Sequence, residues 1–259
     1  MLLPTLDDAG RVFSSDEGYP DMHSPYGMNI VESCATCKLR GQRAFCNLPS
    51  AALGSLEKLK YTTAYPKGAV LFVEGQTPRG VFMLCQGSVK LSVCASDGKT
   101  LILRIAEAGE VLGLGAAVSG KPYEATAETQ EPCQVNFIKG EGLARLMREH
   151  NELALRVAEN LSKTYASACQ EIRALMLPRS AAERLARMLL EWPVKAGDTR
   201  HPGRLTLALS HEEIAQMIGT SRETVTRTFA DFKKKELIQR NGSTVIIQNR
   251  PVLETLIAA

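Results

Sequence analysis

Apolar and polar residues alternate along the chain with two different periods, and each period predicts a different architecture. Between residues 61 and 138, short apolar runs alternate with turns containing Gly, Pro or Asp, a pattern typical of an all-β barrel or roll. Asp97-Gly98 separates two β-rich runs and therefore predicts a hairpin. Residues 50–60 precede this region and predict a short helix capped by Ser50.

Helical periodicity replaces the strand pattern between residues 140 and 177. The apolar positions that recur at helical spacing are Val157, Leu161, Ala168, Ile172 and Leu175. Such a run is longer than one small core needs, so we expect a helix that pairs with its own copy in a homodimer. Leu177-Pro178 predicts where this helix ends, because proline cannot continue the hydrogen-bond ladder.

Two short helices around a tight turn are predicted near the C-terminus. Ser210 and Glu213 have the spacing of a capping box, and Gly219 suits a left-handed turn. Ser221 would cap the second helix, and Asn241-Gly242 predicts the tip of a hairpin that follows it. This order is typical of a helix-turn-helix with a wing.

Polar residues on the outward face of the second helix have the chemistry of a major-groove reader. Arg can donate two hydrogen bonds to guanine, and Glu can accept one from cytosine. A solvated helix face would carry the same charges, but the caps, the turn and the wing together favour DNA binding. The candidate DNA-binding residues are Ser221, Arg222, Glu223, Thr226, Arg227 and Lys233.

Composition narrows the class of protein without identifying it. The 259 residues are 44% hydrophobic, which is enough for a core, and the net charge is only +3. From residue 178 onward there are 13 Lys and Arg residues against 9 Asp and Glu residues, a mild indication of nucleic-acid binding. The sequence has no long apolar run and no signal-peptide pattern, so we expect a cytoplasmic protein without a membrane span. With no nucleophile–base set and no phosphate loop, we do not expect an enzyme.

Cysteine is the residue type that most needs an explanation. Cys34, Cys37 and Cys46 lie in "ESCATCKLRGQRAFCNLP", and clustered cytosolic cysteines favour metal binding or redox chemistry over disulfides. Soft thiolates select iron–sulfur clusters or zinc, and the residues leave both open. Cys85 and Cys94 lie in apolar strand runs and are interpreted as core residues.

The whole order of elements, with "TSRETVTR" and "SAAERLA", resembles the CRP/FNR family of bacterial transcription regulators over residues 34–250. The resemblance implies an α+β fold with a cyclic-nucleotide-binding-like jelly roll, a long dimerisation helix and a winged helix-turn-helix. It also implies a homodimer that binds double-stranded DNA at a two-fold symmetric site and contacts RNA polymerase. The expected divisions are a mobile tail, a sensor domain, the dimerisation helix and the DNA-binding domain, at residues 1–33, 34–139, 140–177 and 178–259.

The resemblance also indicates whether the roll binds a cyclic nucleotide as its effector. Family members that bind cyclic AMP carry a phosphate cassette with a glutamate and an Arg-Ser pair, where this chain has Leu114, Glu124 and Ala125. An anionic phosphate facing Glu124 without an arginine would be repelled, so no cyclic nucleotide is expected.

Oxygen-sensing members of the family instead hold one [4Fe-4S] cluster per subunit on three N-terminal cysteines and one in the roll. Cys34, Cys37 and Cys46 match the first three, and Cys133 falls at the position of the fourth. Eight residues separate Cys37 from Cys46, which is wider than in the best-known member. The resemblance favours an iron–sulfur sensor of oxygen or nitric oxide. Zinc is the lesser alternative, and sensing by thiol oxidation, haem or a small molecule in the roll stays open.

Overall fold

The computed structural model describes residues 25–258 apart from 39, 44, 177–179, 193–203 and 208. Most of the predicted tail and the predicted helix end at Leu177-Pro178 therefore lie outside the described residues. Two short 3-10 turns, η1 (Pro25–Gly27) and η2 (Arg40–Gln42), belong to a segment that runs beneath the first strand. No helix within the described ranges is both long and apolar enough to cross a bilayer.

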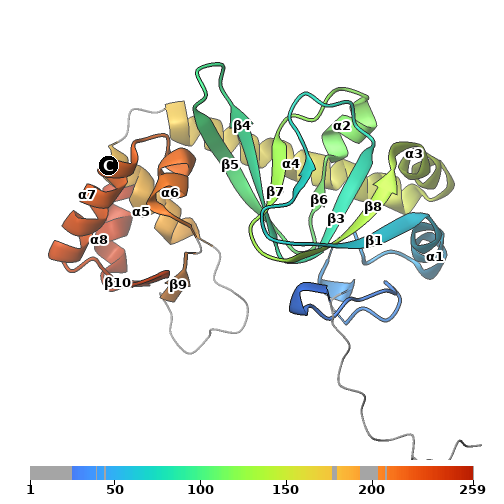
Figure 1. Cartoon of the computed structure of the whole chain (residues 1–259), viewed down its shortest axis with the longest axis horizontal. Coiled ribbons are helices and arrows are strands. Elements are labelled where there is room, and N and C mark those ends of the chain that lie inside the picture. Colours follow the sequence, from blue (N-terminus) through green and yellow to red (C-terminus); the bar gives the residue numbers. More distant parts are fainter. Residues whose placement is uncertain are drawn as a thin grey trace, which may run out of the picture.

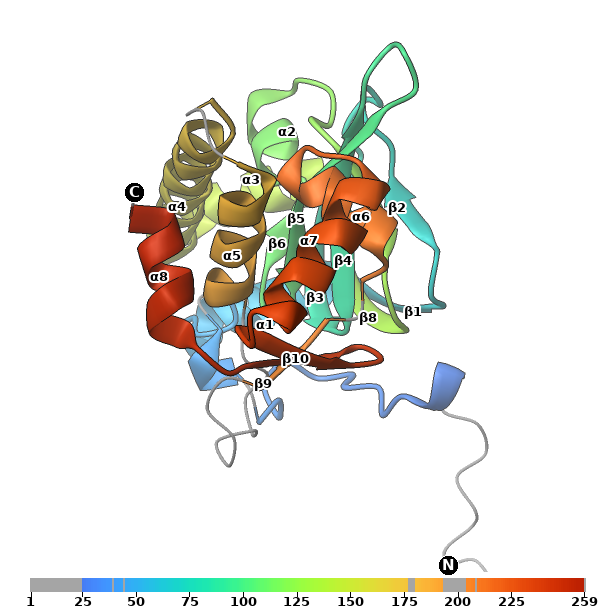
Figure 2. The same cartoon turned by 90° about the vertical axis from the view of Figure 1, so that its left-hand side faces the viewer.

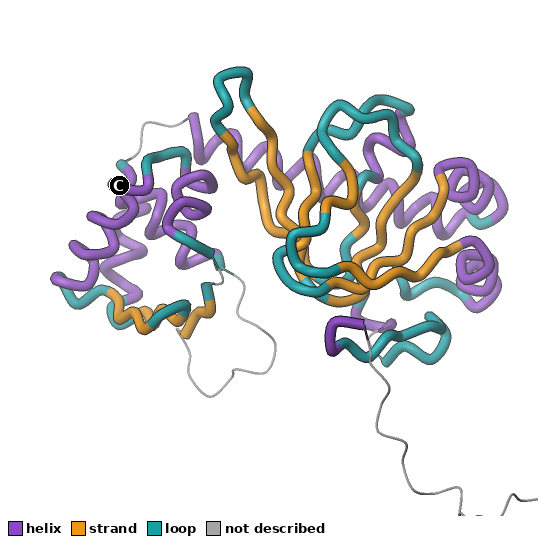
Figure 3. Tube along the Cα trace, viewed as in Figure 1, coloured by secondary structure: helices purple, strands orange, loops and turns teal. Residues whose placement is uncertain are grey.

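Two four-stranded antiparallel sheets form the predicted β-roll (Figures 1 and 3). The first sheet has the order β1-β8-β3-β6 and consists of β1 (Lys60–Tyr65), β8 (Cys133–Lys139), β3 (Gly80–Gln86) and β6 (Val111–Leu112). The second has the order β2-β7-β4-β5 and consists of β2 (Val70–Phe72), β7 (Thr126–Thr129), β4 (Ser88–Cys94) and β5 (Thr100–Glu107).

The hairpin expected at Asp97-Gly98 joins β4 to β5. Cys94 pairs with Thr100 across its base, and Gly98 takes the positive φ of 83° that the turn requires. The interpretation of Cys94 as a core residue is wrong, because it is the last residue of β4 and its side chain is exposed.

Four helices accompany the roll: α1 (Ser50–Leu59), α2 (Leu114–Ser119), α3 (Gly140–Glu149) and α4 (Asn151–Met176). The short helix predicted over 50–60 is thus present. Ser50 is its first residue rather than its cap, since Pro49 holds the cap position and no side chain caps the helix.

The single helix expected over residues 140–177 is in fact two helices, α3 and α4. His150 interrupts the ladder with an extended backbone, φ −133° and ψ 96°, and its N–H still bonds to the carbonyl of Leu146. The break lets α3 bury Leu143 and Leu146 beside α1, while α4 continues along the roll toward the C-terminal domain (Figure 1).

Helix α4 has a buried face and an exposed apolar face. Val157 and Leu161, two members of the predicted dimer stripe, pack instead against the core of their own subunit. Among the α4 side chains that the structure describes, the large apolar ones left exposed are Leu155, Tyr165 and Ile172, at 64%, 72% and 59% exposure. Together with Ala158, Ser162 and Cys169 they repeat at alternating spacings of three and four residues, as in a coiled-coil seam. The side chain of Leu175, the last member of the predicted stripe, lies outside the described ones.

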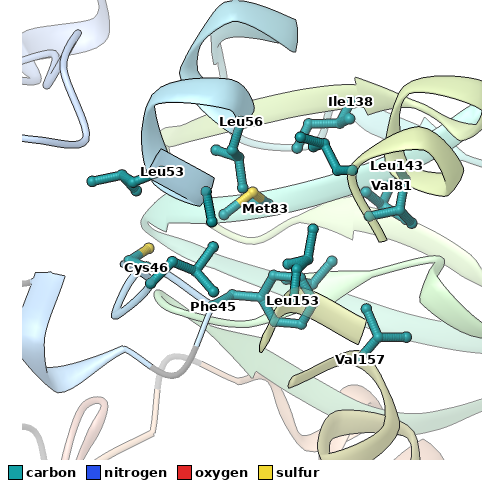
Figure 4. Packing of buried hydrophobic residues seen from close by; sticks show 14 of the residues in the cluster. Phe45, Cys46, Leu53, Leu56, Val81, Met83, Ile138, Leu143, Leu153 and Val157 are labelled. Carbon is teal, nitrogen blue, oxygen red and sulfur yellow. The ribbon is translucent and has the colours of Figure 1, made fainter. Parts of the chain in front are cut away.

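Two apolar cores lie on opposite sides of the β1-β8-β3-β6 sheet, because side chains alternate along each strand. The core inside the roll contains Phe82, Leu84 and Val135. On the outer side, helices α1, α3 and α4 and the N-terminal segment bury a second core (Figure 4). Its members include Phe45, Cys46, Leu56, Met83, Ile138 and Leu153.

The C-terminal domain has a core of its own and is viewed end-on in Figure 2. It consists of α5 (Ala181–Glu191), β9 (Arg204–Thr206), α6 (His211–Ile218), α7 (Arg222–Lys234), β10 (Ile238–Asn241), β11 (Thr244–Ile247) and α8 (Arg250–Ala258). The predicted wing is confirmed, since Asn241 pairs with Thr244 across its tip. Strand β9 adds a third strand to the wing sheet, in the order β10-β11-β9.

Candidate functional site

Local hydrogen bonds set the geometry of the predicted helix-turn-helix. The Ser210 hydroxyl accepts from the N–H of Glu213 at 3.2 Å, and the Glu213 carboxylate accepts from the N–H of Ser210 at 2.9 Å. Gly219 then closes α6 in the left-handed conformation, with φ 62° and ψ 51°. Both sequence predictions are confirmed, and the turn directs the chain into α7.

Helix α7 separates an apolar face from a polar one. Ser221 caps it by accepting from the N–H of Thr224 at 3.2 Å. Val225, Phe229 and Phe232 are buried on the inward face. The predicted DNA-binding residues are all exposed, with Ser221 at the cap and the others on α7: Ser221, Arg222, Glu223, Thr226, Arg227 and Lys233.

Two residues that the sequence reasoning missed join α7 to the wing. His211 Nδ1 lies 2.8 Å from the hydroxyl of Thr226, and Arg240 on β10 contacts His211 Nε2. The Arg240 guanidinium also lies 4.8 Å from the ring centroid of Phe229, on which His211 stacks at 5.1 Å. No local pattern marks this contact, because His211 and Arg240 are 29 residues apart.

The contacts of His211 favour the neutral form of its imidazole. Burial lowers the pKa of its imidazole, and the charges of Arg240 and Arg222 lower it further. A neutral ring accepts at Nε2 from Arg240 and donates from Nδ1 to Thr226, whose hydroxyl donates to the Arg222 carbonyl at 3.0 Å. The hydroxyl of Thr226 is therefore held by protein partners.

Cys34, the first of the three N-terminal cysteines, lies against the outer face of the first sheet. The N–H of Cys34 donates to the Glu57 carboxylate at 2.8 Å. Its sulfur lies 3.5 Å from Lys60 Nζ and 3.8 Å from the side-chain amide of Asn136. Cys34 is therefore buried above β1 and β8, beside one positive charge and one amide donor.

Cys46 lies in the same region and ends a turn in which its own N–H donates to the Arg43 carbonyl at 3.0 Å. Burial raises the pKa of its thiol, as do the neighbouring Cys34 and Cys37, whereas Arg43 and Lys60 lower it. Three of the four predicted metal ligands are thus neighbours. Their chemistry suits a soft metal centre, with two cations close by.

Cys133, the fourth predicted ligand, lies in the other core. Its sulfur contacts the carbonyl oxygens of Ser88 at 3.3 Å and Glu131 at 3.2 Å, and burial raises the pKa of the thiol to about 11. The structure does not bring Cys133 together with the other three. Among the described residues, no three Cys, His, Asp or Glu side chains already stand in a metal-binding arrangement.

Cys85, which the sequence indicated as a core residue, is instead half-buried. Burial raises the pKa of its thiol to about 12, and Cys46 and Cys34 raise it as well. Two of the N-terminal cysteines are therefore within electrostatic reach of Cys85.

A cavity of about 420 Å³ lies between the roll and α4, and its lining includes Leu114, Glu124 and Ala125, which stand where cyclic-AMP-binding members carry the phosphate cassette. Leu114 is buried, and the Glu124 carboxylate lies so close to Gly115 that a Cβ there would be 2.7 Å from its oxygen. Arg104 also lines the cavity, but its guanidinium pairs with Glu110.

Two family models match separate parts of the chain. The cyclic nucleotide-binding domain matches residues 62–150, and the Crp-like helix-turn-helix domain matches residues 183–256. A CRP-like cAMP-activated global transcriptional regulator from Mycobacterium tuberculosis is 26% identical over 207 residues, covering 79% of this chain and 92% of the relative.

Solved structures share the architecture. FixK2 from Bradyrhizobium japonicum superposes with a TM-score of 0.67 at 24% identity, over 77% of this chain and 98% of that one. A CooA mutant from Carboxydothermus hydrogenoformans superposes with a TM-score of 0.66 at 26% identity, over 79% of this chain and 90% of that one. The α+β fold predicted from the sequence is confirmed.

Proposed function

Because the chain belongs to the CRP/FNR family of DNA-binding transcription regulators, we propose that it reads a two-fold symmetric DNA site as a homodimer under the control of its N-terminal cysteine segment. The observation that carries the DNA-reading part is the polar face of α7. Arg222, Glu223 and Arg227 are exposed there, and the cap at Ser221 and the wing fix the direction of the helix. Arg and Glu at the start of such a helix can hydrogen-bond to base edges in the major groove.

The exposed seam of α4 supports pairing of two subunits. Leu155, Tyr165 and Ile172 would otherwise leave a long apolar stripe in water. Pairing α4 with its copy buries this stripe and sets the distance between two α7 helices. A symmetric operator with half-sites about one helical turn apart follows from that geometry.

The cysteine segment supports the sensing part of the proposal. The thiolates of Cys34, Cys37 and Cys46 would hold the centre, Lys60 and Arg43 would offset its negative charge, and the amide of Asn136 would orient Cys34. A bound [4Fe-4S] cluster would supply a redox-labile iron centre, and zinc a closed structural one. We favour iron–sulfur and a response to oxygen or nitric oxide, with zinc or thiol oxidation as alternatives.

Outer-core packing suggests how this segment acts on DNA binding. Phe45 and Cys46 pack in the same core as Leu153 and Val157 of α4 (Figure 4). When the N-terminal segment is held at its cysteines, its packing supports the position of α4. When the segment is released, the outer core that it covers is exposed to water. Metal binding at the cysteine site would then change how α4 pairs with its copy, and so shift the equilibrium between two arrangements of the dimer. Contact with RNA polymerase belongs to the same proposal.

One experiment tests both parts. The protein is purified without oxygen, and iron, acid-labile sulfide and zinc are measured per subunit. DNA binding is then measured by selection from random duplexes and footprinting, before and after exposure to air. We expect one cluster per subunit and a symmetric footprint that air weakens. Absence of any protected site would overturn the DNA-reading proposal, whereas a site with unchanged affinity in air would overturn only the sensing part.

A further inference from the structure

We propose that Cys85, and not Cys133, completes the thiol set of the N-terminal site, so that Cys34, Cys37, Cys46 and Cys85 bind one thiolate-held metal centre. This inference rests on the sensing part of the proposed function. Its chemistry is shared by an iron–sulfur cluster and zinc, because both take four cysteine thiolates.

The direction of Cys133 follows from the alternation of side chains along β8. Gln134 and Asn136 point outward: Gln134 exchanges hydrogen bonds with the backbone of Val31 at 2.9 and 2.7 Å, and Asn136 reaches Cys34. Cys133 and Val135 point the other way, into the core of the roll. Cys133 thus lies on the face of β8 opposite to the N-terminal cysteines.

Close packing holds Cys133 in that position. Gly87, with φ 87°, passes so near that a Cβ there would lie 2.5 Å from the Cys133 sulfur. A one-residue shift of β8, which would present Cys133 to the outer face, would turn every side chain of that strand over. Such a shift would break the pairing of β8 with both β1 and β3.

Strand β3, next to β8, carries a cysteine on the required face. Val81 and Met83 belong to the outer core with Cys34 and Cys46, and Cys85 follows two residues later. The register of β3 against β8 shifts between Leu84 and Gln86, so Cys85 is the extra residue of a bulge. Bulges redirect side chains and free them from the ladder.

Contacts on both sides bring the cysteine segment to this end of β3. The turn that ends at Cys46 begins at Arg43. The Arg43 side chain packs over Gly109, where a Cβ added to the glycine would lie 3.1 Å from it. The N–H of Gly109 donates at 2.7 Å to the carbonyl of Leu84, the residue before Cys85.

On the other side of Cys85, the Gln86 amide donates to the carbonyl of Asn29 at 2.6 Å. Residues of the N-terminal segment therefore reach β3 on both sides of Cys85. Cys37 begins the next turn, in which its carbonyl accepts from the N–H of Arg40 at 3.1 Å, and its side chain is half-buried.

The test uses the full-length protein purified without oxygen and three variants: Cys85→Ala, Cys133→Ala and the control Cys94→Ala, whose thiol is exposed at the far hairpin. Iron, sulfide and zinc per subunit are measured after the same challenge with a chelator. We expect Cys85→Ala to lose metal by about tenfold or more, and the other two to keep the wild-type amount. Loss in Cys133→Ala with retention in Cys85→Ala would overturn the proposal.

A second measurement covers the case in which a variant fails to fold. Wild-type protein is alkylated with and without its metal, and each cysteine is followed by mass spectrometry. We expect Cys85 to be protected only while metal is bound and Cys133 to be unreactive in both states. Reactivity of Cys85 in the loaded protein would overturn the assignment to Cys85 alone. A wild-type protein that binds no metal at all would overturn the sensing proposal together with this inference.

Discussion

The side-chain amide of Asn136 lies 3.8 Å from the sulfur of Cys34, and so joins the middle of β8 to the N-terminal segment. Asn136 is buried, and its oxygen accepts from the hydroxyl of Thr62 at 2.8 Å. One side chain thus spans β1, β8 and the cysteine site. This contact joins the N-terminal segment to the roll.

Asn136→Ala should weaken this junction. The substitution removes the donor to Cys34 and leaves the Thr62 hydroxyl without its acceptor, which should lower the free energy of unfolding by about 1–3 kcal/mol. Urea denaturation measures the loss, and limited proteolysis should show faster cleavage before residue 50. Asn47→Ala, at an exposed position of the same segment, is the control. Equal stability of the two variants would contradict the role of Asn136.

Arg222→Ala should reduce specific DNA binding by about 1–3 kcal/mol and relax the preference at one guanine. The reason is that an exposed arginine at the start of α7 can donate two hydrogen bonds to that base. Binding to the selected site and to single-base variants of it measures both effects. Arg148→Ala on α3 removes the same charge outside the C-terminal domain and serves as the control. A uniform loss across all sequences would make Arg222 a phosphate contact.

Acidification should weaken the C-terminal domain through His211. Its folded pKa is lowered by burial and by Arg240 and Arg222, so the unfolded chain binds more protons near and below its ordinary pKa of about 6.5. The free energy of unfolding should therefore fall as pH drops below about 6.5 and be unaffected by this group above it. Urea denaturation from about pH 7.5 to 5.5 measures the slope. His211→Asn should remove part of it, and an unchanged slope would contradict this assignment.

Ile172→Asp should prevent the proposed pairing of α4 with its copy and leave the protein monomeric at low concentration. Ile172 is 59% exposed on α4 and lies on its apolar seam, where pairing would bury a charge without a partner. Sedimentation velocity measures the association state. Lys163→Asp, exposed on the same helix but off the seam, should remain dimeric. A dimer that survives Ile172→Asp would place the interface elsewhere.

Features that depend only on residues close together in the sequence could be predicted. The capping box of Ser210 and Glu213, the turn at Gly219 and the hairpin tip at Asn241 each need only a few adjacent residues. The break at His150 could not be predicted, because it follows from how α3 packs beside α1. The contact between His211 and Arg240 likewise joins elements that are distant in sequence.

The face of β8 on which Cys133 lies is encoded in the local sequence, but not in the cysteine motif. The order Cys-Gln-Val-Asn-Phe at residues 133–137 already alternates between apolar and polar side chains, which is a strand signal that assigns Cys133 to the apolar face. The match of Cys133 to the fourth cysteine of the oxygen-sensing family members does not indicate on which face of the strand its side chain lies. The partial exposure of Cys85 depends on a bulge that has no signature in the sequence.

Cyclic AMP should leave the melting temperature of the protein unchanged. The cavity beside α4 presents the carboxylates of Glu124 and Glu171, and Arg104, the one arginine among the described residues that line it, already pairs with Glu110. A phosphate entering this cavity would meet uncompensated negative charge. A ligand at one hundred times its Kd would raise the free energy of unfolding by about 2.7 kcal/mol, which a thermal melt detects readily. Glu124→Gln removes one carboxylate and tests whether that charge is the obstacle. A saturable rise in the wild-type melting temperature would show that the cavity accepts the nucleotide despite Glu124.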